Sequence, residues 1–356
     1  MEEKKTAGAQ IKEIANRLGV SQSTVSVVLG GRGDKIRISK ETQKKVMDMA
    51  RELNYRPNIY ARRLRQGSEE VPYVVVVFWR NDNLNSRLGR FIQGFHEASE
   101  RKDCRVELMV QPYKPGELMR HAEMLSGNRV SGAIISGLSS EDQEQLEARD
   151  YSIPVILIGR ESTKFHCVMM DSYQTGEQCI ACMAAPEVKT GAFIGFNNDS
   201  RAERKMEAGF MVGCRSRNIR VKEDWNVYLR CSSYENGYGA AKEVLSKIEL
   251  PSAWLVADCR LAGGIMDYCR DNNIRVPEDV RLIFFEESGI LKYNRPPLSS
   301  VDVPSMEMAE TALDIVLLAC SSSIDIPIRR EHLPLYRIRE SSGSYGPAGK
   351  EAVQSK

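Results

Sequence analysis

Six side chains near the N-terminus have the chemistry to read DNA bases or to bind phosphates. They are Ser21, Gln22, Ser23, Thr24, Ser26 and Val27. Gln22 can pair bidentately with adenine, Ser23 can bond to several bases, and Val27 offers apolar contact, for instance with a thymine methyl. The remaining hydroxyl side chains suit phosphate oxygens, which fix the register of a protein on the duplex. The alternative interpretation of such small polar residues is helix capping and solvation.

Two short helices must present these side chains. Apolar residues in 11–18 recur at i, i+3, i+4 and i+7, which predicts a helix with one apolar face. Gly19 ends this helix, and the Ser21 hydroxyl can cap the next one, predicted over 22–29. The second helix turns its apolar residues inward and the candidate DNA contacts outward. Two short helices joined around a glycine form a helix-turn-helix, whose second helix enters the major groove.

A third helix is predicted from an N-cap at Ser39 to about Leu53. Val46, Met49 and Ala50 repeat the same apolar spacing, ending at Leu53. Three helices with facing apolar residues are enough to close a small core, so this part of the chain is predicted to fold as an all-α head.

A second stretch with DNA-binding chemistry follows the third helix. Pro57 prevents continuation of that helix, and Asn58 can cap a new short one. Residues 11–29 and 55–64, in this order, resemble the DNA-binding head and the hinge helix of the lactose-repressor (LacI/GalR) family of bacterial transcription regulators. The resemblance covers residues 11 to about 340 and implies a head over residues 1–55 and a hinge helix with linker over 56–70.

The resemblance implies further DNA contacts in the hinge segment, namely Tyr55, Asn58, Ile59, Arg62 and Leu64. Leu64 matches the hinge leucine of the family, which is expected to wedge between base steps in the minor groove. The alternative is that Leu64 packs against the core. Arg62, Arg63 and Arg65 are placed to bind phosphates. A hinge helix this short is not stable alone, so we expect it to order on DNA beside a partner's hinge, which requires a dimer.

One position departs from the family pattern in the head. Family members commonly carry Arg where this chain has Val27, and Arg is the commonest reader of guanine in the major groove. The usual guanine contact is therefore missing here or is made by another donor.

The rest of the chain alternates short apolar runs with amphipathic stretches. The runs are 74–79, 132–135, 155–158, 192–195, 253–257 and 282–285. Strands without polar alternation are covered on both faces, which predicts parallel α/β sheet with right-handed crossovers. About 270 residues of it favour two doubly wound lobes with a cleft between them.

The resemblance implies the same architecture, a periplasmic-binding-protein-like core whose two lobes exchange segments. The predicted fold is thus an N-terminal all-α helix-turn-helix head with a hinge helix, then an α/β core of two doubly wound parallel-sheet lobes over 71–340. Lobe one is predicted over about 71–168 plus 297–325 and lobe two over about 171–295 plus 327–340. A Ser/Gly-rich tail over 341–356 is predicted to be disordered.

Charge is divided unevenly along the chain. The net charge is +2, but residues 4–66 hold 15 Lys and Arg against 5 Asp and Glu, and the remainder holds 35 against 43. A basic head beside an acidic core places positive charge where phosphates would be. The alternative is a charged face that is merely solvated. No secretory leader opens the sequence and no apolar run is long enough for a membrane span, so a cytoplasmic location is predicted.

Nothing in the core predicts catalysis, a metal or a cofactor. The four histidines stand apart in sequence, and no nucleophile elbow, phosphate loop or HExxH pattern occurs. Cys179 and Cys182 form a C-x-x-C inside a helical pattern without a second Cys or His pair, so we interpret them as small buried side chains rather than metal ligands. The chain is therefore predicted not to be an enzyme, and no catalytic residue is assigned.

Candidate effector contacts lie at the predicted strand ends, where the resemblance places ligand-facing polar groups. They are Arg87, Arg160, Asp171, Arg204, Asp258 and Glu286. Several family positions have changed. Met206 stands where an Arg is expected, and Arg87 stands where an aromatic residue is expected, so an aromatic platform is predicted to be missing. Arginine forks match phosphate and carboxylate oxygens, which favours an anionic sugar derivative, a phosphorylated sugar or a sugar acid, over a neutral sugar.

Two interpretations of function remain from the sequence. In the first, the chain is a transcription regulator, typically a repressor, that binds a pseudo-palindromic double-stranded operator as a homodimer or a tetramer and is switched by a small-molecule effector in the interlobe cleft. In the second, the core has lost small-ligand binding and serves as a dimerisation or protein-docking module. The incomplete pocket signature keeps the second interpretation open.

Overall fold

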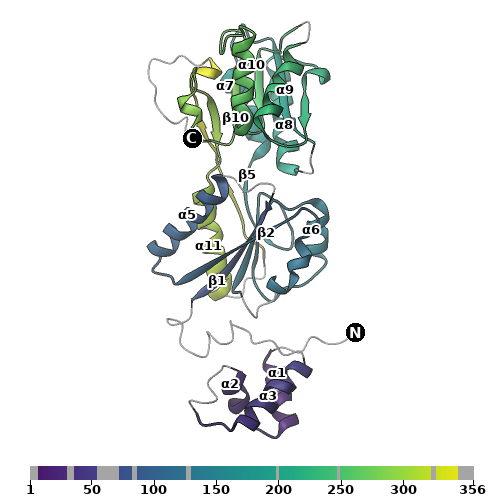
Figure 1. The fold of residues 1–356 in the computed structure, drawn as a ribbon, viewed down its shortest axis with the longest axis vertical. Coiled ribbons are helices and arrows are strands. Elements are labelled where there is room, and N and C mark those ends of the chain that lie inside the picture. Colours follow the sequence, from purple (N-terminus) through teal and green to yellow (C-terminus); the bar gives the residue numbers. More distant parts are fainter. Residues whose placement is uncertain are drawn as a thin grey trace.

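The computed structural model describes residues 7–29, 36–53, 72–81, 86–125, 130–197, 200–246, 249–321 and 326–343. Figure 1 shows three bodies along the long axis, a helical head and two α/β lobes. Tyr55 and the hinge segment predicted over 56–70, with its candidate DNA contacts Asn58, Ile59, Arg62 and Leu64, lie outside the described residues. No helix of the described residues is long and apolar enough to cross a membrane.

The head contains the three helices that the sequence predicts, α1 (Ala7–Leu18), α2 (Gln22–Leu29) and α3 (Lys40–Glu52). Their buried residues form one cluster: Ile11, Ile14, Ala15, Val25, Val28, Val46 and Ala50. Both predicted caps are present, because the Ser21 hydroxyl accepts a hydrogen bond from the Thr24 amide at 3.0 Å and the Ser39 hydroxyl accepts one from the Thr42 amide at 3.1 Å. Apolar spacing and capping together therefore determine this small domain.

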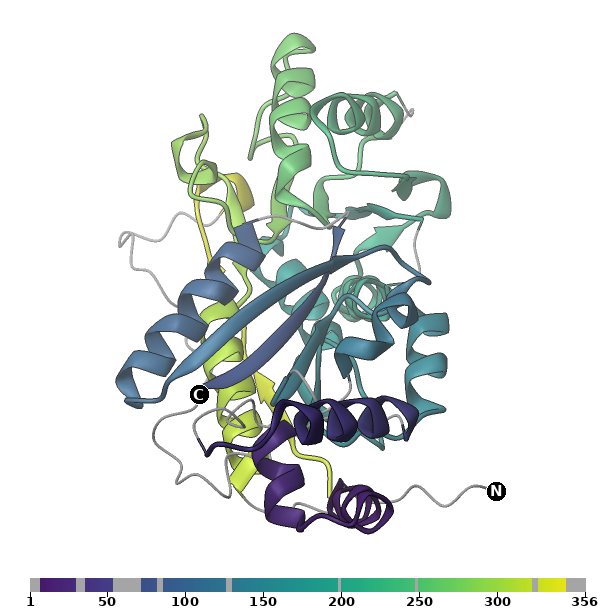
Figure 2. The same ribbon diagram turned by 60° about the horizontal axis from the view of Figure 1, so that its bottom comes forward.

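Lobe one is built on a six-stranded sheet with the order β12-β5-β4-β3-β1-β2. Its strands are β1 (Tyr73–Arg80), β2 (Val106–Tyr113), β3 (Gly132–Ser136), β4 (Val155–Ile158), β5 (His166–Met170) and β12 (Arg329–His332). All described pairings in this sheet are parallel. Helices α5 (Ser86–Arg101) and α11 (Ser305–Ser321) cover one face, while α6 (Ser140–Glu147) and η2 (Leu118–Leu125) cover the other (Figures 1 and 2).

Strand β1 shows why this lobe has two cores. Val75 and Val77 point into the cluster under α5 and α11, whereas Val76 and Phe78 belong to the cluster under α6 and η2. A strand buried on both faces needs apolar residues at every position, and this explains the uninterrupted apolar run in the sequence.

Lobe two repeats the plan with the sheet order β13-β11-β10-β9-β6-β7, and β8 also pairs with β6. Its strands are β6 (Thr190–Phe196), β7 (Arg220–Val221), β8 (Val227–Leu229), β9 (Ala253–Val256), β10 (Arg281–Phe285), β11 (Ser299–Asp302) and β13 (Leu335–Arg337). Its helices are α7 (Ser172–Met183), α8 (Arg201–Ser216), α9 (Tyr234–Leu245) and α10 (Ala262–Asp271), with short turns η3 (Glu223–Trp225), η4 (Cys259–Leu261), η5 (Leu291–Tyr293) and η6 (Glu340–Ser342). Only the β11–β13 pair is antiparallel among the described pairings.

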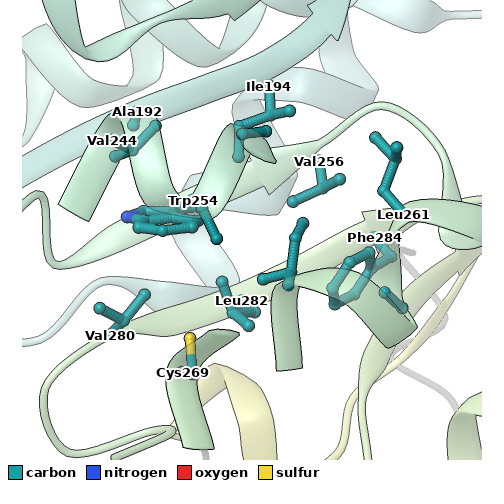
Figure 3. Packing of buried hydrophobic residues seen from close by; sticks show 14 of the residues in the cluster. Ala192, Ile194, Val244, Trp254, Val256, Leu261, Cys269, Val280, Leu282 and Phe284 are labelled. Atoms are coloured by element: carbon teal, nitrogen blue, oxygen red, sulfur yellow. The ribbon is translucent and has the colours of Figure 1, made fainter. Parts of the chain in front are cut away.

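Trp254 lies at the centre of the core between this sheet and α9 and α10. Figure 3 shows its ring beside Ala192, Val244 and Leu282, with Phe284 and Leu261 further along the same face. The indole N–H donates to the carbonyl oxygen of Pro251 at 2.7 Å, so its polar atom is satisfied despite full burial. The opposite face packs under α7 and α8, where Cys179 is buried and Cys182 partly buried.

The thiols of the C-x-x-C sequence lie in an apolar setting. Burial raises the pKa of the Cys179 thiol, and it raises the pKa of the Cys182 thiol to about 11. Since the thiolate is the reactive and metal-binding form, these environments agree with interpreting both as packing residues.

The points at which the chain crosses between the lobes differ from the predicted ranges. The prediction assigned 297–325 to lobe one and 327–340 to lobe two, but β11 lies in the second sheet and β12 in the first. The crossings therefore lie at 303–304 and 333–334. β11 reads Ser-Ser-Val-Asp and β12 reads Arg-Arg-Glu-His, so neither has the apolar run by which buried strands are recognised.

The predicted disorder from Ser341 onward is wrong for the first residues of that segment. Ser341 and Ser342 are fully buried. The Ser341 hydroxyl donates to the carbonyl oxygen of Leu282 at 2.8 Å and accepts from the Ser299 amide at 2.8 Å. Small hydroxyl side chains thus complete the second sheet at a place where composition alone predicts a loose tail. Residues 344–356 lie outside the described residues.

Candidate functional site

The start of the second helix of the head carries the predicted DNA-reading residues. Ser21, Gln22 and Ser23 are exposed, and Thr24 with Ser26 and Val27 is half-buried, whereas Val25 and Val28 are buried in the head core. The Ser21 and Thr24 hydroxyls lie 2.9 Å apart, so they share a hydrogen bond at the helix start in addition to the cap. The exposed turn therefore has hydroxyl, amide and backbone N–H groups available to a duplex.

A cleft with a volume of about 350 Å³ lies between the two lobes. Its lining comes from the carboxyl ends of β1, β3 and β4 in lobe one and of β6, β9 and β10 in lobe two. This is the edge at which open parallel sheets bind ligands. Among the residues that the structure describes, six arginines and three carboxylates line it: Arg80, Arg87, Arg160, Arg201, Arg230 and Arg260 with Glu203, Asp258 and Glu286.

On the lobe-one side, the turn that follows β3 supports two of these arginines. Tyr113 of β2 donates its hydroxyl to the carbonyl oxygen of Ser136 at 2.8 Å and so anchors the turn. Arg160, only 6% exposed, donates through Nη2 to the carbonyl oxygen of Leu138. Gly137 has a φ of +77°, and a Cβ at this position would lie 2.6 Å from Cδ of Arg80. The stem of Arg80 therefore lies directly across the glycine backbone.

On the lobe-two side, helix α8 begins at the cleft. Ser200 caps it by accepting from the Glu203 amide at 3.2 Å, and Arg201 is its first residue. Glu203 is occupied within the lobe, because its carboxylate accepts from the Phe196 amide at 2.5 Å. The cleft thus receives the positive end of a helix together with an arginine from the same turn.

Asp258 is buried, and its carboxylate is already engaged. Arg260 donates to it through Nε at 3.1 and 3.0 Å and through Nη2 at 2.6 Å, and this contact raises the pKa of the Arg260 guanidinium. Glu286, 7% exposed, follows β10 with a φ of +73°. The lobe-two side of the cleft therefore contains both carboxylates and arginines.

The buried guanidinium of Arg160 lies in an electrostatically unfavourable place. Burial lowers the pKa of the Arg160 guanidinium, and the charges of Arg201, Arg204 and Arg80 lower it further. Because each of these groups is cationic, an anion placed among them would relieve both the desolvation and the mutual repulsion.

The structure brings four of the six predicted effector residues into the cleft lining, namely Arg87, Arg160, Asp258 and Glu286. Asp171 does not line it but caps α7, where it accepts from the Gln174 amide at 2.9 Å. Arg204 lies on α8 between the lining residues Glu203 and Met206 but does not line the cleft itself; it is exposed, and its charge acts on Arg160. Asp171 and Arg204 therefore stand at the sequence positions at which the family resemblance places ligand contacts, but neither lines the cleft.

Sequence reasoning missed several lining residues. Arg80, Arg201 and Arg230 were not predicted, and neither were Phe196 and Phe285. An aromatic platform was predicted to be missing, because Arg87 stands at the expected aromatic position, but two phenylalanines line the cleft from other strand ends. Applying the strand-end rule to every apolar run would have found Phe196 and Phe285.

Two family models match this chain. Residues 10–58 match bacterial regulatory proteins of the lacI family, and residues 184–342 match a periplasmic binding protein-like domain. The sucrose operon repressor of Klebsiella pneumoniae is 25% identical over 338 residues, which cover 93% of this chain and 97% of that repressor.

Solved structures show the same fold over nearly the whole chain. A complex of the transcriptional regulator CelR with cellobiose has a TM-score of 0.66 at 21% identity, covering 93% of this chain and 99% of that one. The lac repressor dimer bound to operator and the anti-inducer ONPF has a TM-score of 0.65 at 19% identity, covering 93% of this chain and 98% of that one. The order of head and two-lobed core is thus the same in both.

Proposed function

We propose that this chain, which belongs to the lacI family of bacterial regulatory proteins, binds a pseudo-palindromic operator as a homodimer and represses transcription under the control of a small anionic effector in its interlobe cleft. It is a DNA-binding transcription regulator and not an enzyme, and we place it in the cytoplasm with its DNA. Assembly of dimers into a tetramer remains compatible with this function. The observation that carries the effector part is the arginine-lined cleft between the lobes.

The head supports the DNA-binding part. Its second helix exposes Ser21, Gln22 and Ser23 at the N-terminal turn, and the segment around it carries the positive charge of the chain. For the hinge we propose that Tyr55, Asn58, Ile59, Arg62 and Leu64 contact DNA, as the resemblance implies. A dimer places two heads on one duplex, which calls for a site with two-fold symmetry.

The cleft favours the effector-switched function over the second interpretation, in which the core has lost its ligand. Burying Arg160 near the positive charges of Arg201, Arg204 and Arg80 costs free energy that an anionic ligand would offset, and a core kept only for docking or dimerisation gains nothing from this arrangement. The cavity is also in the size range of small-ligand sites, which is about 300–1,000 Å³. Asp258 and Glu286 are proposed to bind hydroxyl groups of the ligand.

Selection from a random duplex pool tests the DNA-binding part. We expect a pseudo-palindromic consensus, and binding to the full site should exceed binding to one half-site and fall steeply with rising salt, because Lys and Arg release counterions from phosphates. Equal affinity for full and half sites, or a flat salt response, would contradict the proposal.

Calorimetry with the full chain tests the effector part. Phosphorylated sugars and sugar acids should bind more tightly than the matched neutral sugars, and Arg160→Ala should abolish the response of operator binding to the ligand. Arg120→Ala is the matched control, because Arg120 is exposed in lobe one and pairs at the surface with Glu117. Tight binding of neutral sugars, or indifference to Arg160→Ala, would argue against an anionic effector. If no compound binds, the second interpretation, a core that serves as a docking or dimerisation module, would be favoured.

A further inference from the structure

We propose that the anionic group bound in this cleft is a phosphate monoester in its dianionic form, held on a two-arginine cradle at the turn that follows β3. The cradle consists of Arg80 and Arg160 with the backbone of Ser136, Gly137 and Leu138. This inference rests on the proposed function and narrows its ligand from any anionic sugar derivative to a phosphorylated one.

The turn that follows β3, residues 136–138, holds Arg160 in place. Tyr113 anchors it through the carbonyl oxygen of Ser136, and the carbonyl oxygen of Leu138 accepts from Nη2 of Arg160. Arg160 is nearly fully buried, so its guanidinium has little freedom to turn away. One edge of the guanidinium is thus fixed by the protein, and the group still lines the cleft.

The same turn determines the path of Arg80. The side-chain stem of Arg80 crosses Gly137, with Cδ 2.6 Å and Cγ 2.9 Å from where a Cβ would stand. Any larger residue would displace the stem, and the φ of +77° is itself unfavourable for residues with a Cβ. Gly137 therefore acts as a positioning residue for the stem of Arg80, and the side chains of Arg80 and Arg160 both contact this turn.

Lobe two brings a third positive charge toward the same point. Arg201 opens α8 at the cleft, and its charge is the largest electrostatic influence on Arg160 after burial. Three guanidinium groups from two lobes thus act on one small volume.

The number of charges and donors distinguishes a phosphate from a carboxylate. A carboxylate has one charge and two oxygens, which one arginine fork can saturate. A phosphate monoester has three terminal oxygens and close to two charges above its second pKa of about 6, so it can accept from two or three forks at once. Three arginines that line one cleft, with Arg80 and Arg160 in contact with the same turn, therefore match the dianion better than the monoanion of a sugar acid.

The test uses inorganic phosphate first, because it needs no knowledge of the organic part of the ligand. The melting temperature of the full chain is measured against phosphate, acetate and chloride at equal ionic strength, at pH 5.5 and pH 7.5. Phosphate should raise the melting temperature, and more strongly at pH 7.5 than at pH 5.5 because only the dianion binds tightly. Acetate should match chloride at both pH values. Titrations with glucose 6-phosphate, glucuronate and glucose extend the comparison to organic ligands.

Variants then locate the effect. Arg80→Met and Gly137→Ala should each weaken phosphate binding by about tenfold to a hundredfold, the usual loss for one charge-assisted contact, and Arg80→Lys should keep part of it. Gly89→Ala is the matched control, because Gly89 is an exposed helix position where an added Cβ would meet nothing within 4 Å. If Gly137→Ala fails to fold, Arg80→Met and Arg80→Lys decide the question.

The outcomes separate this inference from the proposed function. A rise in melting temperature that is specific to phosphate, larger at pH 7.5 and lost in Arg80→Met supports the cradle. No advantage of phosphate over acetate, no dependence on pH, or full retention of binding in Arg80→Met would overturn it. If glucuronate or a neutral sugar binds and releases operator DNA while phosphate has no effect, the chain is still an effector-switched regulator and only the phosphate cradle is wrong.

Discussion

Val27 is the residue of the head whose substitution reports most directly on base reading. It is half-buried on α2, one turn after Ser23, and its side chain can offer only apolar contact. Val27→Arg should shift the selected operator toward guanine at one symmetric pair of positions, because an arginine fork matches the O6 and N7 acceptors of guanine. Selection of bound sequences with both proteins measures this, and Val27→Leu controls for size. Identical consensus sequences for all three would show that residue 27 does not face the bases.

At the same scale, the sequence predicts some cleft residues and not others for a clear reason. Arg160 follows a short apolar run, so its place at a strand end can be predicted locally. Arg80 also ends a strand, but its contact with Gly137 arises because β1 lies beside β3 in the sheet. Strand pairing is a long-range property, and one sequence gives its order only through general rules of topology.

Helices α7 and α8 pack closely because glycines lie at their crossing. A Cβ at Gly209 would stand 1.9 Å from the carbonyl oxygen of Tyr173, which leaves no room for any side chain. Gly209→Ala should therefore destabilise the chain by about 1–3 kcal/mol or more, as overpacked sites do. Gly239→Ala is the control, because nothing lies within 4 Å there and alanine favours the helix. Urea unfolding of both variants measures the difference, and equal stability would mean that the two helices separate without cost.

The hinge segment gives a second prediction at the level of elements, and it depends on sequence alone because residue 64 lies outside the described residues. Leu64→Ala should weaken specific operator binding by about 1–3 kcal/mol, since unstacking a base step is favourable only when a side chain fills the gap. Operator affinity and DNA bending measure this. A lower melting temperature with unchanged affinity and bend angle would instead identify Leu64 as a packing residue.

Elements with regular apolar spacing were predictable, and polar ones were not. The three head helices and the strands β1, β3, β4, β6, β9 and β10 follow from apolar periodicity. β11 and β12 have polar sequences, and their assignment to strands depends on neighbours that pair with them. The exchange of segments between the lobes was expected from the family resemblance, but the crossing points could not be located without those pairings.

At the scale of the whole molecule, two ionic contacts among the described residues join the lobes, one buried and one exposed. Asp302, at the end of β11, is buried, and its carboxylate accepts from Arg90 of α5 in lobe one and from Arg337 of β13 in lobe two at 3.1 Å. It stands directly before the crossing to α11. This carboxylate therefore bonds to both lobes next to the crossover segment.

The second contact lies where α8 of lobe two faces the end of β4 in lobe one. Lys205 donates to Glu161 at 2.7 Å, and both side chains are more than half exposed. The bond to Lys205 lowers the pKa of the Glu161 carboxyl, yet solvent screens such pairs strongly. Glu161 directly follows Arg160, so this pair joins the two lobes next to the cradle proposed above.

The burial of each contact should determine how much it contributes to stability. Asp302→Asn should cost about 1–3 kcal/mol of stability, because it removes the charge that two arginines share at a buried position. Glu161→Gln should lower stability by at most about 1 kcal/mol and alter phosphate affinity by at most about fivefold, because exposed pairs contribute about 0.2–1 kcal/mol. Calorimetric unfolding and phosphate titration of both variants measure these effects. The double variant Glu161→Lys and Lys205→Glu, which swaps the two charges, should restore the wild-type affinity. If Glu161→Gln abolished binding while the swap failed to restore it, Glu161 would act on the ligand directly rather than through its bond to Lys205 across the lobes.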